Sequence, residues 1–148
     1  MENLIQTMRL MSQKSIDDPR SHFLLRLILA NDSAPAPWAI WRWARNDVRF
    51  HDEYPQIVAS LPRLLDAPVG DCNDLAVATA VLLRAARLPV QWALGYDEQG
   101  KPRHIWTMVK WGDRWLHVDP SPGAEPPGGL APSRVANATI SNWEPFSI

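Results

Sequence analysis

The segment GDCNDLAVATAVLLRAARLPV at residues 70–90 decides the fold, because it joins the chain's one cysteine to its most regular helical pattern. Between Leu75 and Leu83 it is rich in alanine and nearly free of polar residues, which favours a helix inside the protein. Acidic residues precede this run, basic residues follow it and Pro89 ends it, as the helix dipole and proline geometry prefer. The sequence therefore predicts a buried central helix with Cys72 at its start.

Three strand-like runs follow this helix, at residues 90–96, 104–111 and 114–119. Gly112-Asp113 separates the last two runs and is typical of a two-residue hairpin turn. Because helical patterns come before these runs, the order of elements predicts an α+β domain. In that domain a cysteine-bearing helix packs on a small antiparallel sheet.

Helices are also expected upstream, over residues 4–14, 19–30 and 38–48. The chain from Pro120 onward is rich in proline, which predicts an extended strap or a mobile tail with little regular structure. We read residues 1–148 as one domain composed of a helical extension, a core and a strap. These three parts span residues 1–37, 38–122 and 123–148.

The composition excludes several classes of protein. The 148 residues carry a formal net charge of -1, with no basic excess to bind the phosphates of nucleic acids. The longest apolar run, residues 23–30, includes Arg26 and is far shorter than the roughly 20 residues of a membrane span. No basic and apolar leader is visible at the start, so we expect a cytoplasmic protein without a signal peptide. One cysteine excludes an internal disulfide and a cysteine-rich zinc site.

The predicted hairpin brings candidate catalytic side chains together. Closing it at Gly112-Asp113 pairs Trp106 with Asp119, and strand alternation places His104 on the same face. The Asp119 carboxylate can then accept a hydrogen bond from one imidazole nitrogen of His104 and leave the other nitrogen for a thiol. Cys72 supplies that thiol at a helix start, where backbone N–H groups favour a thiolate and can donate to an oxyanion.

Four blocks of sequence, taken in order, resemble the transglutaminase-like superfamily. They are GDCNDLA at residues 70–76, LLRAARLPV at 82–90, HIW at 104–106 and WLHVDP at 115–120. The resemblance covers about residues 38–122 and implies a papain-like fold with a Cys-His-Asp triad. By that resemblance Cys72 is the nucleophile, His104 the base and Asp119 the acid that orients the base.

The resemblance also implies supporting residues. Family members place a tryptophan upstream whose indole N–H helps to hold the oxyanion. Trp38, Trp41 and Trp43 lie in the corresponding region, and among them we favour Trp41. Asp71, Asn73 and Trp106 are further candidates for oxyanion or supporting roles. Asn73 stands where the animal cross-linking enzymes have tryptophan, and their β-domains and calcium sites are not seen in this sequence. The resemblance is therefore to compact bacterial and bacteriophage members, and it favours hydrolysis over cross-linking.

Some of these residues have simpler explanations. A single cysteine in an alanine-rich helix is commonly a small core residue, and Asp74 can serve only to charge the first helical turn. His117 shares a strand face with His104, which leaves a zinc site with Asp119 and Cys72 as the alternative to a triad. We prefer the triad, and we expect no metal and no cofactor.

The leading hypothesis is a cysteine peptidase or amidase that attacks an amide of a peptide or protein substrate and forms a thioester. A cell-wall amidase is a narrower form of this hypothesis, which an assay of muropeptide turnover distinguishes. The alternative is a non-catalytic structural or binding protein that keeps the fold, for example in a phage particle. Its partners are then virion or prophage proteins and its location is the virion, and an unreactive thiol favours it.

Overall fold

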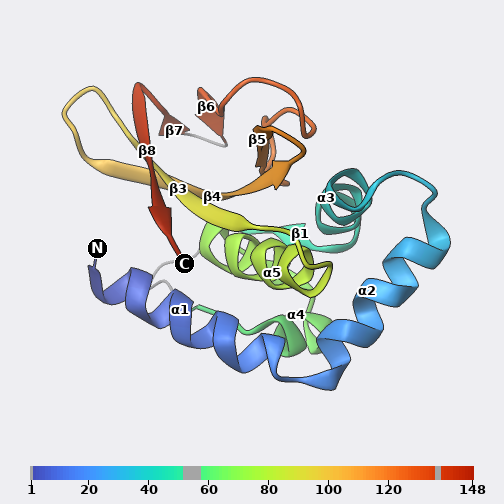
Figure 1. The fold of residues 1–148 in the computed structure, drawn as a ribbon. Helices are drawn as coiled ribbons and strands as arrows, with labels where there is room; N and C mark the ends of the chain where they lie inside the picture. Colours follow the sequence, from blue (N-terminus) through green and yellow to red (C-terminus); the bar gives the residue numbers. More distant parts are fainter. Residues whose placement is uncertain (1, 52–57, 136–137) are drawn as a thin grey trace.

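The computed structural model describes residues 2–51, 58–135 and 138–148, which form an α+β fold (Figure 1). Its helices are α1 (Glu2–Ile16), α2 (Pro19–Asn31), α3 (Ala36–Asp47), α4 (Leu61–Asp66) and α5 (Cys72–Ala85). Its strands are β1 (Arg49–Phe50), β2 (Val69–Gly70), β3 (Val90–Tyr96), β4 (Pro102–Trp111), β5 (Arg114–Val118), β6 (Arg134–Val135), β7 (Ala138–Thr139) and β8 (Asn142–Ser147). Figure 1 shows α5 beneath the main sheet, with α1 and α4 on the other side of α5. The predicted fold class is confirmed.

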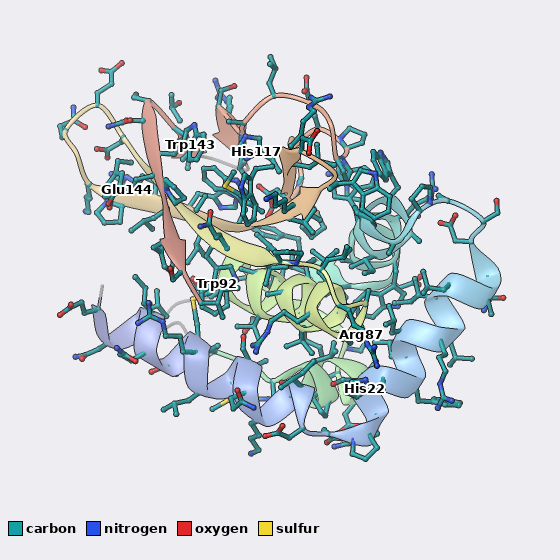
Figure 2. All side chains as sticks on the ribbon, in the orientation of Figure 1. His22, Arg87, Trp92, His117, Trp143 and Glu144 are labelled. Carbon is teal, nitrogen blue, oxygen red and sulfur yellow. The ribbon has the colours of Figure 1, made fainter. Side chains whose placement is uncertain are left out.

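Hydrogen bonds from the sheet fix the position of α5 along the strands. Trp92 of β3 and Thr107 of β4 both donate to the carbonyl oxygen of Ala76, at 3.0 and 2.9 Å. In Figure 2 the labelled Trp92 lies between the sheet and the helices below it. Because both bonds converge on one helical turn, they bring Cys72 to the start of β4, where the two elements line one cavity.

The main sheet has the strand order β5-β4-β3-β8, and every neighbouring pair is antiparallel. Trp111 pairs with Arg114 across the turn between β4 and β5. Gly112 in this turn has a φ of 64°, in the left-handed region that favours glycine. The hairpin therefore has the register that its Gly112-Asp113 turn predicts.

The strand β8 corrects the prediction that residues 123–148 have little regular structure. It pairs with β3 and places Pro145 opposite Ala93 at the edge of the sheet. Proline lacks the N–H of a ladder bond, and an edge strand tolerates this because one of its sides has no partner strand. The proline content of this segment does not reveal that Pro145 lies in a strand at the edge of the sheet.

The C-terminal segment covers the face of the sheet opposite α5. Ile140 packs there in a cluster with Ala93, Trp106 and Met108. A Cβ added at Gly95 would lie 2.8 Å from Ile140 and 2.9 Å from Trp106, so the glycine permits their close approach. The sheet is thus covered on both faces (Figure 1).

The helix α2 contains the longest apolar run of the chain. It begins with Pro19 after Asp18, whose side chain accepts a hydrogen bond from the backbone N–H of Arg20 at 2.9 Å. It is 13 residues long. None of the helices in the described ranges is long and apolar enough to cross a membrane.

Candidate active site

Cys72 is the first residue of α5, and two aspartates hold that helix start from both sides. Asp71 Oδ1 accepts the backbone N–H groups of Asn73 and Asp74 at 3.0 and 3.1 Å. Asp74 Oδ2 in turn accepts the N–H of Asp71 at 3.0 Å, and its Oδ1 accepts the N–H of Ala59 at 2.6 Å. The two carboxyl groups form a reciprocal cap that fixes the backbone on which the thiol sits.

The cap places two carboxyl groups in a buried environment. Burial, followed by the negative charge of Asp74, raises the pKa of Asp71 to about 7 from its ordinary 3.8. Asp71 Oδ2 is buried and has no hydrogen-bond partner in the described part of the chain. A proton held by Asp71 near neutral pH limits the negative charge beside Cys72.

His104 and Asp119 form a buried pair at the start of β4. His104 Nε2 donates to Asp119 Oδ2 at 2.6 Å, and each side chain is 3% exposed. The other oxygen of Asp119 accepts the backbone N–H of Ser121 at 3.0 Å. With Nε2 engaged by the carboxylate, Nδ1 is the nitrogen of His104 that remains for a thiol.

The carboxylate of Asp119 keeps the imidazole protonated. Burial alone lowers the pKa of His104, but the charge and hydrogen bond of Asp119 outweigh it, and Cys72 adds to their effect. Together they raise the pKa of His104 to about 10. The imidazole is therefore a cation at neutral pH, and a neighbouring cation favours the thiolate form of a cysteine.

The thiol and the imidazole meet at a cavity of about 80 Å³. Cys72 is partly exposed there, and His104 is 4% exposed. The described residues that line it are Leu4, Cys72, Asn73, Leu94, Pro102, Arg103, His104 and Ile105. The arrangement presents a thiol, a cation and an amide to a small volume that a reacting group can enter.

Asn73 lines this cavity and has a buried side-chain amide. Its side chain is buried, and Oδ1 lies 3.9 Å from the Sγ of Cys72. Its Nδ2 is buried and has no hydrogen-bond partner among the residues that the structure describes. A buried polar group without a partner calls for an explanation, and a developing oxyanion beside the thiol is an acceptor that would satisfy it.

Trp41 occupies a different position from the oxyanion role expected of it. Its indole Nε1 donates to the backbone carbonyl of Asp119 at 2.7 Å, which uses its one N–H. Arg45, one helical turn later, donates from Nη1 to the carbonyl of Ser121 at 2.8 Å and lies 5.8 Å from the Trp41 ring. The two side chains of α3 therefore fix the backbone that carries the Asp119 carboxylate.

Trp106 supports the imidazole from the outer face of the sheet. Its ring stacks on His104, with centroids 5.5 Å apart and planes at 23°. Its Nε1 donates to Nδ1 of His117 at 3.0 Å, and Trp143 packs edge-on against His117 at 5.0 Å. Figure 2 shows His117 and Trp143 together on this face, away from α5. Burial lowers the pKa of His117, in spite of an opposing effect from Asp119.

The arrangement leaves His117 apart from the thiol. Its Nδ1 accepts the indole N–H of Trp106, so this nitrogen is not directed at Cys72 as the zinc alternative requires. In the described ranges, no group of three His, Cys, Asp or Glu side chains could hold a metal ion.

Sequence reasoning missed three contributors to the site. The bond from Ala59 to Asp74 joins segments that no local pattern connects. The contact of Arg45 could have been predicted, because residues four apart lie on one face of a helix and Trp41 was already a candidate. Arg103 lines the cavity, and its position next to His104 in a strand gave no hint that it does so.

Comparison with known proteins agrees with this architecture. The model of the transglutaminase-like superfamily matches residues 28–120, a range that includes Cys72, His104 and Asp119. No curated protein sequence matches the chain.

Two solved structures have a similar fold. A proposed cysteine protease from Cytophaga hutchinsonii is 21% identical with a TM-score of 0.54, over 68% of this chain and 37% of that one. A proposed protease from Parabacteroides distasonis is 13% identical with a TM-score of 0.62, over 83% of this chain and 26% of that one. The chain thus spans well under half the length of either protein. At these identities the likeness shows the fold alone.

Proposed function

The chain belongs to the transglutaminase-like superfamily, and on this premise we propose that it is a cysteine enzyme that hydrolyses amide bonds in peptide or protein substrates. One observation carries the proposal. His104, which is paired with the buried Asp119, lines the same cavity as the chain's one cysteine at the start of a helix. A nucleophile, a base and a group that orients the base are the parts that acyl transfer by a thiol needs.

In the proposed mechanism, the Cys72 thiolate attacks the substrate carbonyl carbon while His104 is an imidazolium. The carbonyl electron pair moves onto oxygen, which accepts from the N–H of Cys72 and from Asn73 Nδ2. The C–N bond then breaks, and the amine leaves with the proton of His104 Nδ1. The products of this half-reaction are the free amine and an enzyme that carries a thioester on Cys72 beside a neutral imidazole.

Water completes the cycle in the second half-reaction. His104 Nδ1 takes a proton from a water molecule, whose oxygen attacks the thioester carbonyl carbon. The C–S bond breaks and returns the thiolate beside the imidazolium. Throughout both steps Asp119 holds Nε2 and compensates the charge that His104 gains and loses. Trp41 and Trp106 hold Asp119 and His104 in place.

The test is labelling with a peptidyl fluoromethyl ketone, which requires an activated thiolate to displace fluoride. Mass spectrometry of the intact chain reads the result, because Cys72 is the one cysteine. We expect labelling that Cys72→Ala abolishes and that His104→Ala slows at least about 100-fold. His22→Ala is the matched control, since His22 lies on the exposed surface of α2 (Figure 2). Labelling that is equally slow in the wild type and in His104→Ala would contradict the proposal.

A non-catalytic role is the second candidate, and the size of the cavity favours it. The cavity of about 80 Å³ is smaller than the roughly 300 Å³ at which ligand pockets begin, and Leu4 of α1 lines it. A protein that keeps this fold for assembly would leave Cys72 unlabelled, in the wild type and in Leu4→Ala alike. Faster labelling of Leu4→Ala would instead show that α1 only narrows the entrance of a working site.

A further inference from the structure

Arg103 is the other charged residue among the described residues that line the cavity. It precedes His104 in β4 at a shift of the pairing register, where His104 pairs with Gly95 and Pro102 with Tyr96, so Arg103 has no partner on β3. Such an irregularity can turn a side chain away from the regular alternation of the strand. Arg103 lines the cavity there together with Cys72, the first residue of α5.

A preorganised carboxylate holds the guanidinium in place. Arg103 Nε donates to Asp97 Oδ2 at 2.7 Å. Asp97 Oδ1 accepts the backbone N–H groups of Gln99 and Lys101, each at 2.9 Å. The bond from Lys101 and then the contact with Arg103 lower the pKa of Asp97, so this carboxyl stays ionised. The tight turn between β3 and β4 is thus a fixed anchor for the arginine.

The anchor leaves part of the guanidinium unused. Arg103 makes its one side-chain hydrogen bond to the described residues through Nε, so both terminal nitrogens remain for a ligand. The side chain is 45% exposed, and Asp97, at 13%, is not part of the cavity lining. An arginine held by one edge can offer its other N–H groups as a fork that matches the two oxygens of a carboxylate.

The polar groups of the cavity point to the same ligand. Among the described residues that line it, Arg103 and His104 are charged, and both are cationic at neutral pH. Each cation is paired with one carboxylate outside the lining, Asp97 or Asp119. The preference for an anionic group therefore comes from the terminal N–H groups of Arg103 that Asp97 does not use, which can donate to both oxygens of a carboxylate.

We propose that Arg103 binds a carboxylate on the acyl side of the substrate, so that the preferred substrates are acidic peptides. The acidic side chain lies next to the scissile carbonyl, with its oxygens on the terminal nitrogens of Arg103 while Cys72 attacks. This inference rests on the proposed function, since it assigns a substrate class to the same thiol. Arg103 is a specificity residue in this account and takes no part in bond breaking.

The first test compares two alkylating reagents that differ in one charge. Iodoacetate and iodoacetamide both form an S–C bond with Cys72 as iodide leaves, and one cysteine makes the rates unambiguous. We expect Arg103→Gln to lower the ratio of the iodoacetate rate to the iodoacetamide rate by about threefold to fivefold. Arg103→Lys keeps the positive charge but loses the paired N–H groups of the guanidinium. We expect its rate ratio to lie between those of the wild type and Arg103→Gln.

The matched control is Arg114→Gln, which makes the same change of charge at the exposed turn between β4 and β5. Its ratio should equal that of the wild type, and thermal unfolding should show all variants folded. An Arg103→Gln ratio equal to that of the control would overturn the inference. That result leaves the proposed function intact, because the proposed function fails only if thiol reactivity does not depend on His104.

The second test extends the comparison to a peptide side chain. Two chloromethyl ketones are made with acetyl-Gly-Asp or acetyl-Gly-Asn as the acyl part, so that only the side-chain carboxylate differs. We expect faster labelling by the aspartyl reagent in the wild type, and the advantage should disappear in Arg103→Gln. Equal labelling of the wild type by both reagents would overturn the assignment of acidic peptides.

Discussion

Two pairs of buried ionisable side chains flank the cysteine, and they differ in the sign of their charges. Asp71 and Asp74 are both acids, and burial together with the neighbouring carboxyl raises the pKa of Asp71 to about 7. His104 and Asp119 are a base and an acid, and the pKa of His104 rises to about 10 although burial opposes it. All four residues are 4% exposed or less. At similar burial, the charge of the partner therefore decides whether the neutral or the charged form persists.

The two pairs have a common consequence for the thiol. The acidic pair keeps a proton near neutral pH, which reduces the negative charge next to Cys72. The mixed pair keeps a cation beside it. Both effects favour the thiolate, and replacing an aspartate of either pair by asparagine tests them at nearly constant side-chain size.

Asp119→Asn breaks the mixed pair and should have the largest effect. Without the carboxylate, burial lowers the pKa of His104 and only the smaller effect of Cys72 opposes it, so the cation beside the thiol is lost at neutral pH. We expect alkylation of Cys72 by iodoacetamide at about pH 7 to slow at least tenfold, while the fold is kept. If Asp119 only holds the turn to Ser121, stability drops by about 1 kcal/mol and the rate does not change. Both quantities should be measured on one sample.

The same variant should change how stability depends on pH. The folded protein keeps the proton of His104 up to about pH 10, and the unfolded chain releases it near 6.5. This contribution to the free energy of unfolding is complete below about pH 6.5 and is lost as pH rises to about 10. We expect Asp119→Asn to lack this alkaline loss, which thermal unfolding at a series of pH values detects. Parallel curves for the two proteins would contradict the assignment.

Asp71→Asn acts on the acidic pair and should have a moderate effect with a distinct pH range. The folded pKa of Asp71 is about 7 and its ordinary value is 3.8. Its contribution to stability is thus present below about pH 4 and is lost as pH rises through 7. Asparagine keeps an acceptor for the helix start and has no proton to lose. Between about pH 5 and 8, the free energy of unfolding of the variant should therefore rise relative to that of the wild type, by on the order of 1 to 3 kcal/mol.

Asp74→Asn is the control for that comparison. Asparagine has one acceptor oxygen, but the N–H groups of Asp71 and Ala59 use both oxygens of Asp74. We expect a loss of about 1 to 2 kcal/mol at every pH, measured by the same unfolding series. If both variants lose stability equally at all pH values, the two carboxyl groups do not differ as the structure indicates.

How much could be predicted from the sequence depended on whether a signal was local. The helix at Cys72 and the hairpin at Gly112-Asp113 are determined by neighbouring residues, and both were predicted correctly. The hairpin register alone was enough to suggest that His104 and Asp119 lie together. The structure gives the distance between them, 2.6 Å, and their burial.

The rest depended on contacts between distant segments. The edge strand β8 pairs with β3, which is distant in the sequence, and its prolines suggested a strap or tail with little regular structure. The partner of the Trp41 indole depends on where α3 packs. The hydrophobic periodicity of the sequence predicts the helix but not its packing position. The second role of Asp74 requires Ala59, fifteen residues away. Such contacts depend on packing, and no local pattern contains them.

Trp41→Phe acts on the backbone that carries Asp119, and we expect it to have the smallest effect on stability and on the reactivity of Cys72. The variant loses the bond from the indole to the Asp119 carbonyl and keeps an aromatic ring. We expect a cost of about 1 kcal/mol in stability and a change of less than about threefold in the alkylation rate. An indole that held the oxyanion would instead be worth about 100-fold or more in kcat, with little change in stability. Unfolding and turnover measured together separate the two roles.

The charge of His104 is the central claim, and nuclear magnetic resonance of ¹⁵N-labelled histidine tests it most directly. His104→Ala identifies the resonances of His104, and those of His117 serve as an internal reference for a neutral ring. We predict that both nitrogens of His104 keep imidazolium shifts from about pH 6 to about pH 9, because Asp119 raises its pKa to about 10. A midpoint near the ordinary value of about 6.5 would contradict the account, since the cation beside the thiol would then be absent at neutral pH.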